Sequence, residues 1–333
     1  MAARMRQKLK LLYIADILKK CTDEEHPINA VEICDKLAQF GVTAERKAIY
    51  DDIQYLIEYG YDIVKTRTPK AGFFLASREF EQPEICLLCD AVRTAKFISL
   101  KKTRELIAKL DSMQSEYQNN RRIDNVFIDA SGKCKNEELF YVIDGISRAI
   151  KENKKISFKY ITRTLKNGRE VENVIKERKI SPYAMTWQDD HYYLIGNYEK
   201  YDNLIHLRID RMKSVEVLKE AARPFGEVSE YKDVFDVADY TKKLFGMFGG
   251  EAEDITLRCS ISVLEQVIDR FGEEIFIKGV TDTNFDFSAK AVISNALVTW
   301  LINYGSDIKV LKPKKLCDMI AERAKTLINM YNE

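Results

Sequence analysis

The chain has 333 residues, too many for one ordinary domain at the usual size of about 150 residues. It contains 53 Lys and Arg against 52 Asp and Glu, so a formal net charge of +1 gives no global basic field that would indicate nucleic-acid binding. The hydrophobic content of 46%, with 6 Pro and 14 Gly, excludes a disordered or fibrous chain and is typical of a globular protein.

Residues 1–10 are basic but lack the uninterrupted apolar stretch of a signal peptide, and no segment approaches the roughly 20 apolar residues of a membrane span. We therefore expect a cytoplasmic protein without a membrane partner. Seven cysteines, scattered and odd in number, indicate reduced thiols. Cys86 and Cys89 form a lone pair inside an apolar helical run, which favours packing over zinc or redox chemistry, so we expect neither a metal nor a cofactor.

Three helices are predicted at the N-terminus, over residues 5–20, over residues 29–40 with Asn29 as N-cap, and from Thr43 to Gly60. Two short strands, 61–64 and 73–75, then flank a basic loop. Three helices followed by such a wing indicate a winged helix-turn-helix.

The third helix is expected to bury one apolar stripe and to present polar side chains from its first turns. The stripe consists of Ile49, Ile53, Leu56 and Ile57. Residues 1–70 are almost balanced in charge, and a polar helix face is usually only a solvated one, but the cations gather on the N-terminal arm, the third helix and the wing. We predict that the DNA-contacting residues are Thr43, Arg46, Lys47, Tyr50, Lys65, Arg67 and Lys70.

Residues 79–135 are interpreted as a helical connector and linker, and an amphipathic helix over residues 136–153 leads into β-structure. Between residues 156 and 218, five or six short alternating runs separated by turn signals predict a small β-barrel. After a loose stretch up to residue 253, the order strand, helix, strand, strand, helix, strand, helix predicts an α+β sandwich.

Four motifs follow one another in the middle of the chain: Ile156-Ser157-Phe158-Lys159-Tyr160, Ser181-Pro182-Tyr183, Tyr192-Tyr193-Leu194 and Leu207-Arg208-Ile209-Asp210-Arg211-Met212. This set resembles the WYL-domain transcriptional regulators, and the resemblance covers nearly the whole chain. Two positions depart from the family pattern. Tyr192 replaces the name-giving tryptophan, and Ile205 stands where the family often has an arginine.

The resemblance implies a multidomain α+β chain with five parts. They are a winged helix-turn-helix (1–78), a helical connector and linker (79–135), an Sm-like or SH3-like WYL β-barrel with its preceding helix (136–220), a linker (221–250) and a C-terminal extension, or WCX-like, domain (251–333).

The resemblance also implies that the WYL barrel binds an anionic ligand, which is a nucleic acid or nucleotide in some members. Residues 151–220 hold 15 Lys and Arg against 11 acidic residues, and arginine beside aromatic rings suits phosphates and stacked bases. The ligand candidates are Ser181, Tyr183, His191, Tyr192, His206, Arg208 and Arg211. On an ideal strand Arg208 and Arg211 face opposite sides, so one of them is expected to serve the fold. Asp210 is interpreted as a structural partner of an arginine.

We therefore expect a homodimeric regulator that binds double-stranded DNA and is controlled by an anionic ligand, a nucleotide or single-stranded nucleic acid. The alternative is an accessory protein that binds single-stranded nucleic acid and modulates a neighbouring defence enzyme. An enzyme is the least favoured class, because the three histidines, His26, His191 and His206, have no catalytic context and no glycine-rich phosphate loop is present.

Overall fold

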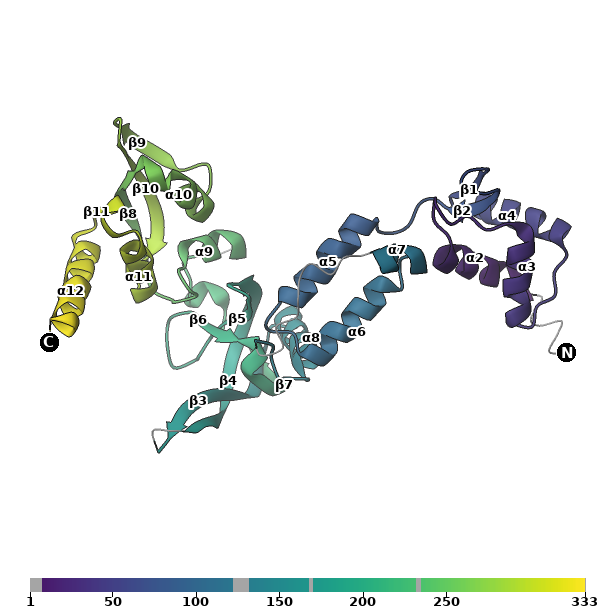
Figure 1. Cartoon of the computed structure of the whole chain (residues 1–333). Helices are drawn as coiled ribbons and strands as arrows, with labels where there is room; N and C mark the ends of the chain where they lie inside the picture. The colour runs from purple at the N-terminus through teal and green to yellow at the C-terminus, as the bar shows by residue number, and fades with distance from the viewer. Residues whose placement is uncertain (1–7, 122–131, 168–169, 232–234, 333) are drawn as a thin grey trace. The chain divides into compact units, whose positions relative to one another are not determined.

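The computed structural model describes residues 8–121, 132–167, 170–231 and 235–332. The chain divides into two compact units, one ending at Glu137 and the other beginning at Glu138, shown in Figure 1. None of the helices in these ranges is both long and apolar enough to cross a membrane. The basic residues Arg4 and Arg6 of the predicted N-terminal arm lie outside the described ranges.

The first unit begins with the three helices predicted from the sequence, α2 (Lys10–Cys21), α3 (Ala30–Gln39) and α4 (Arg46–Tyr59). The side chain of Asn29 accepts from the backbone N–H groups of Val31 and Glu32, which makes it the predicted N-cap of α3. Gly60 ends α4 in the left-handed conformation that favours glycine. Antiparallel strands β1 (Ile63–Thr66) and β2 (Gly72–Leu75) complete a winged helix-turn-helix.

The core of this domain differs from the predicted stripe of α4 at one position. Ile49, Ile53 and Leu56 are buried as expected, but Ile57 is 39% exposed. Asp52 is buried instead, and its carboxylate lies 2.6 Å from the Lys10 ammonium group of α2. The apolar stripe is therefore narrower than predicted, and an ion pair between α2 and α4 completes the helix packing.

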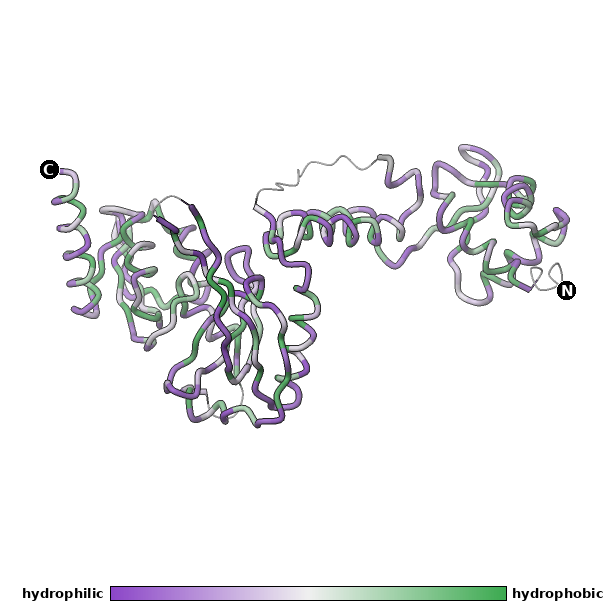
Figure 2. Tube along the Cα trace, turned by 90° about the horizontal axis from the view of Figure 1, so that it is seen from below, coloured by the Kyte–Doolittle hydropathy of each residue, from purple (hydrophilic) through white to green (hydrophobic). Residues whose placement is uncertain are grey.

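The connector consists of α5 (Gln82–Thr94), α6 (Leu100–Asp111) and α7 (Glu116–Arg121). The predicted helical connector is divided into separate helices, because the backbone turns at Ala95 and Ser99 caps a new helix. In Figure 2 hydrophobic and hydrophilic colours alternate along these helices, as they do in amphipathic helices.

The connector contacts the helix-turn-helix through the turn that joins α2 to α3. The buried carboxylate of Asp23 accepts from the Ser115 hydroxyl at 3.1 Å, and its other oxygen lies 2.7 Å from His26 Nδ1. The His26 ring stacks on Tyr117 of α7 with centroids 3.7 Å apart and planes at 3°. These contacts fix the connector to the DNA-binding domain.

The second unit begins with α8 (Leu139–Lys151), whose apolar side packs on a five-stranded antiparallel sheet. The strands are β3 (Lys154–Lys166), β4 (Glu170–Gln188), β5 (His191–Asn197), β6 (Ile205–Arg208) and β7 (Met212–Ala221). They are ordered β6-β5-β4-β3-β7, and β6 and β7 do not pair with each other within the described residues. The predicted closed barrel is therefore corrected to an open sheet with two edges.

One long strand explains why the sequence seemed to contain an additional strand. The runs at 171–179 and 184–187 are both part of β4. β4 pairs with β3 up to Ile180 and with β5 from Ser181 onward. The register with β5 shifts between Pro182 and Ala184, where the proline has no backbone N–H for the ladder.

Residues 222–231 and 235–250 leave the sheet edge and pack back on the sheet. They include α9 (Val237–Lys243) where the sequence predicted only a loose stretch. Val228, Leu244 and Met247 share a buried cluster with Ile195 of β5, so one face of the sheet is covered by this segment.

The C-terminal domain contains β8 (Ala252–Ser260), α10 (Leu264–Phe271), β9 (Phe276–Val280), β10 (Asn284–Val292), α11 (Asn295–Asn303), β11 (Ile308–Lys312) and α12 (Lys314–Tyr331). The antiparallel sheet has the order β11-β8-β10-β9, which is the ferredoxin-like topology with one added helix. Leu257 and Phe287 of the sheet lie in one core with Leu297 of α11 and Leu316 of α12. Helices cover one sheet face, as the predicted α+β sandwich requires.

Candidate functional site

The predicted DNA-contacting residues of the third helix lie on one exposed surface at the start of α4. Arg46, Lys47 and Tyr50 are exposed on its first turns, and Thr43 is exposed in the preceding turn. Their position follows from α4 itself, which turns Ile49 and Ile53 into the core and the opposite side outward. The N-terminal end of this helix is the part that meets base edges in helix-turn-helix proteins.

The wing contributes Lys65, Arg67 and Lys70, all of them exposed. The Lys65 ammonium group lies 5.6 Å from the centre of the Tyr50 ring, so β1 and α4 share one cationic and aromatic surface. Lys70 is already paired, since its ammonium group lies 2.6 Å from Glu32 Oε1 at the start of α3. The structure therefore gathers the seven predicted residues in one domain but neutralises one of the wing cations.

The predicted ligand residues of the second unit separate into different environments, and two of them are engaged by the backbone of Arg223. Ser181, which is buried, accepts from the Arg223 N–H at 2.9 Å, and the Tyr183 hydroxyl donates to the Arg223 carbonyl at 2.9 Å. Burial raises the pKa of Tyr183. These two side chains hold the first residues after β7, a role that sequence reasoning missed.

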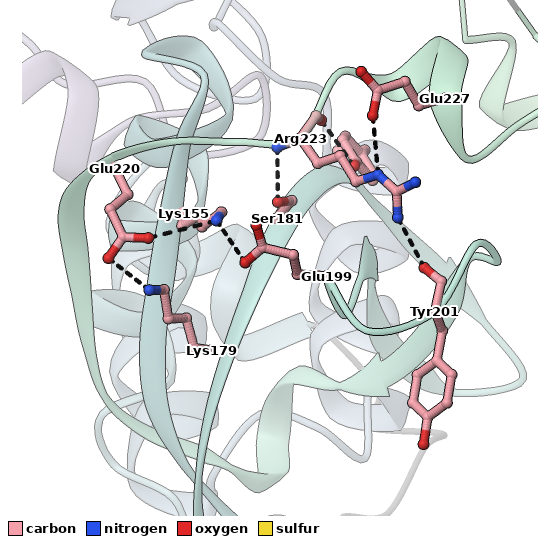
Figure 3. A network of polar contacts seen from close by, with 9 residues as sticks. Lys155, Lys179, Ser181, Glu199, Tyr201, Glu220, Arg223 and Glu227 are labelled. Atoms are coloured by element: carbon pink, nitrogen blue, oxygen red, sulfur yellow. Dashed lines mark hydrogen bonds and ion pairs between the residues drawn. The ribbon is translucent and has the colours of Figure 1, made fainter.

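Figure 3 shows the polar network that surrounds this contact. The Arg223 guanidinium group donates to Glu227, to the Tyr201 carbonyl and to Asp202. Beside it, the Lys155 ammonium group lies 2.9 Å from Glu199 and 3.4 Å from Glu220. Because each of these cations has carboxylate partners, the positive charge on this part of the surface is neutralised within the fold.

Arg208 and Arg211 are both within electrostatic range of the Tyr193 hydroxyl group. Burial, the largest effect, raises the pKa of that hydroxyl, and the two guanidinium charges act against it. The ideal strand on which the two arginines would face opposite sides is not present, because β6 ends at Arg208 and Ile209–Arg211 forms a 3₁₀-helix.

Arg208 differs from Arg211 in how its guanidinium group is used. It donates to both carboxylate oxygens of Asp210, at 3.0 and 2.6 Å, and its backbone N–H donates to the Tyr160 hydroxyl at 3.3 Å. Asp210 is thus the structural partner of an arginine that the sequence predicted. The bidentate pair fixes Arg208 against the sheet and leaves Arg211 one turn further along.

His191 and His206 lie on the same face of β5 and β6 as Tyr193, while Tyr192 lies on the opposite face because neighbouring strand residues alternate. His206 Nε2 lies 2.9 Å from the Tyr240 hydroxyl of α9. Burial lowers the pKa of His206 to about 4, so the ring is neutral at physiological pH. This covered position does not suit direct contact with a charged ligand.

Arg178 on β4 is a functional candidate that sequence reasoning did not select. Its guanidinium carbon lies 4.4 Å from the centre of the Tyr160 ring, and it donates to the Tyr198 hydroxyl at 2.7 Å. The local sequence gave no signal for this stack, because Tyr198 is 20 residues away. Within the described ranges no group of three His, Cys, Asp or Glu side chains is arranged to hold a metal ion.

The second unit combines an open antiparallel sheet that ends in a 3₁₀ turn with a domain of ferredoxin-like topology. The model of the WYL domain matches residues 141–217, and the model of the WCX domain matches residues 251–328. The chain therefore contains a WYL domain followed by a WCX domain.

Among solved structures, the chain is similar to the proteasome accessory factor B/C (PafBC) of Arthrobacter aurescens, with 15% sequence identity and a TM-score of 0.29. The match covers 97% of this chain and 49% of that chain, so this chain spans about half the length of PafBC. A comparison with curated proteins found no match.

Proposed function

We propose that this WYL-domain protein is a transcriptional regulator that binds double-stranded DNA through α4 and the wing and responds to an anionic ligand on its WYL domain. The observation that carries the proposal is the shared surface of Arg46, Lys47, Tyr50 and Lys65, which the helix-turn-helix presents away from its core. Exposed cations at the start of a recognition helix and on a wing suit base edges and phosphates.

For the ligand, the geometry favours Arg211 over Arg208 as the anion contact. Asp210 occupies both edges of the Arg208 guanidinium group, so an incoming phosphate has to displace a bidentate carboxylate there. Arg211 is within electrostatic range of the partly buried Tyr193, and a cation near an aromatic ring suits a nucleotide or a single strand. We further propose that the protein acts in the cytoplasm by binding rather than catalysis, and as a homodimer, which matches the two-fold symmetry of DNA half-sites.

The experiment is selection of DNA fragments with the purified full chain, followed by affinity measurements on the selected duplex and on a random duplex. Arg46→Ala is expected to weaken binding to the selected duplex by about 1–3 kcal/mol and to relax base preference. Lys65→Ala is expected to weaken binding to both duplexes alike. Equal binding of both duplexes by wild type and Arg46→Ala would refute the role of α4.

The control of DNA binding is tested separately with short single strands. Arg211→Ala is expected to lose single-strand binding, and Lys213→Ala, which removes an equal charge two residues later, serves as the matched control. If single strands bind and no duplex is selected, the accessory single-strand-binding role is the correct one. Sedimentation across micromolar concentrations tests the dimer.

A further inference from the structure

A groove of about 710 Å³ in the second unit is not used by the proposed DNA or phosphate contacts. Its floor is formed by the segment after α9, by α10 and by α11, and the β4–β5 turn closes one end. The aromatic side chains of Phe248 and Trp300 line it, together with the guanidinium group of Arg270. Phe248 is 58% exposed, so the groove has an aromatic face open to solvent.

Arg270 is held in a way that aims hydrogen-bond donors at this groove. Its guanidinium carbon lies 3.9 Å from the centre of the Phe245 ring, and one of its N–H groups donates to the Leu244 carbonyl. An arginine has five N–H donors, and these contacts fix the plane of the group while using one of them. Burial lowers the pKa of Arg270.

Two carboxylates on the rim restrict what the groove can accept. Asp189 and Asp269 both line it, and Asp189 lies within electrostatic range of Arg270. Their charges disfavour a phosphate inside the groove. A neutral ring with acceptors on one edge and N–H donors on another satisfies both the arginine and the acids, and its faces can stack on exposed aromatic side chains.

Guanine has this combination of groups. Its N7 and O6 accept from an arginine in a bidentate contact, and the N–H groups of its other edge donate to a carboxylate. Adenine presents an amino donor where guanine has O6, and this donor would oppose the guanidinium group. We propose that the groove around Arg270 binds a guanine base, with Arg270 on the O6 and N7 edge, Asp189 or Asp269 on the opposite edge and Phe248 against the ring.

This inference rests on the proposed ligand control and identifies the ligand class more closely as a guanine nucleotide or a guanine-containing single strand. Asp189 is within electrostatic range of Tyr193 as well as of Arg270. The β4–β5 turn that lines the groove therefore also lies near Tyr193, and on the proposal a base at Arg270 and a phosphate at Arg211 belong to one ligand.

Tryptophan fluorescence tests the groove directly. The chain has two tryptophans, so Trp187→Phe leaves Trp300, which lines the groove, as the only tryptophan, and its emission is excited selectively at the red edge of the absorption band. Titration of that full-length variant with guanosine is expected to quench Trp300 saturably, and adenosine is expected to bind at least about tenfold more weakly. Adding Arg270→Gln is expected to lower the affinity for guanosine by at least about tenfold, as loss of a bidentate base contact does.

The matched control is Arg258→Gln, which removes another arginine of the same domain that pairs with Asp286 outside the groove, and it is expected to leave guanosine affinity unchanged. If Arg270→Gln lowers the thermal transition, Phe248→Ala provides the second test, because this exposed ring supports stacking more than the core. Equal affinity for guanosine and adenosine, or guanosine affinity unchanged in Arg270→Gln or Phe248→Ala, overturns the proposal.

The failure of this proposal is distinguishable from failure of the proposed function. If guanosine quenches Trp300 but GMP and guanine-containing single strands leave duplex affinity unchanged, the base site stands and ligand control of DNA binding is wrong. If duplex affinity responds to single strands equally in wild type and Arg270→Gln, ligand control stands and the base site is wrong.

Discussion

The ion pair between Glu32 and Lys70 predicts that an acidic residue limits the affinity of the wing for DNA. Glu32 Oε1 lies 2.6 Å from the Lys70 ammonium group, and Glu32 Oε2 accepts from the Asn29 N–H at 2.7 Å. Burial by itself would raise the pKa of Glu32, but the bonds from Lys70 and Asn29 lower it overall, so the residue is ionised at neutral pH. In the proposed complex Lys70 therefore interacts with Glu32 as well as with a phosphate, and its attraction to the phosphate is weaker than that of an unpaired lysine.

Glu32→Gln separates these two roles of the side chain. Glutamine at the third helical position retains the capping box with Asn29, so α3 keeps its start. The pair itself is exposed, and its loss is expected to cost about 0.2–1 kcal/mol of unfolding free energy. The released Lys70 adds one phosphate contact, so the slope of log K against log salt concentration becomes steeper by about 0.9. A full contact corresponds to roughly eightfold tighter binding at about 0.1 M salt.

The assay is fluorescence anisotropy with a random-sequence duplex at several salt concentrations. Glu58→Gln is the matched control, because it removes the same charge about 18 Å further along α4 from Arg46, beyond the Debye length of about 10 Å. Glu32→Gln combined with Lys70→Ala is expected to lose the gain. An unchanged salt slope in Glu32→Gln, with a normal thermal transition, would show that Lys70 does not contact phosphate and would refute this reasoning.

Three further predictions concern the second unit. Ser181→Ala leaves the Arg223 N–H without its buried acceptor, so the unfolding free energy measured in urea is expected to fall by about 1–3 kcal/mol. Ser181→Thr retains the hydroxyl and is the control. An unchanged unfolding free energy in Ser181→Ala would favour a role of Ser181 in ligand contact. Gly196→Ala places a Cβ 2.7 Å from the Ser181 carbonyl oxygen. Because this oxygen belongs to the backbone, the backbone has to shift, and the unfolding free energy in urea is expected to fall by about 1–3 kcal/mol. Burial lowers the pKa of His206 in the folded state to about 4, below its ordinary value of 6.5, so the unfolded state binds the additional proton and stability is lost as pH falls from about 6.5 to 4. Wild type should lose about 3 kcal/mol of unfolding free energy over this range relative to His206→Gln. Parallel pH profiles of the two proteins would contradict the burial of this ring.

The sequence by itself determined the local elements and their order. Helix starts and stops follow from short-range chemistry, as at Asn29 and Gly60, and the winged helix-turn-helix was predictable because each of its elements carries its own periodicity. The family was recognisable from four short motifs in order. Exposure of Arg46 and Lys47 followed from the helical period alone, since it requires only that Ile49 and Ile53 face inward.

Tertiary structure decided how distant side chains combine, which no local pattern contains. The local pattern predicted a strand through Arg208 and Arg211, whereas the chain forms a 3₁₀ turn where β6 ends, and both charges are within electrostatic range of Tyr193. Glu32 meets Lys70 across 38 residues, and Ser181 meets Arg223 across 42. Charge counts from the sequence give the number of cations. Their partners in the fold decide which of them can bind a ligand or DNA, because an arginine or lysine that is already paired must first lose its carboxylate partner.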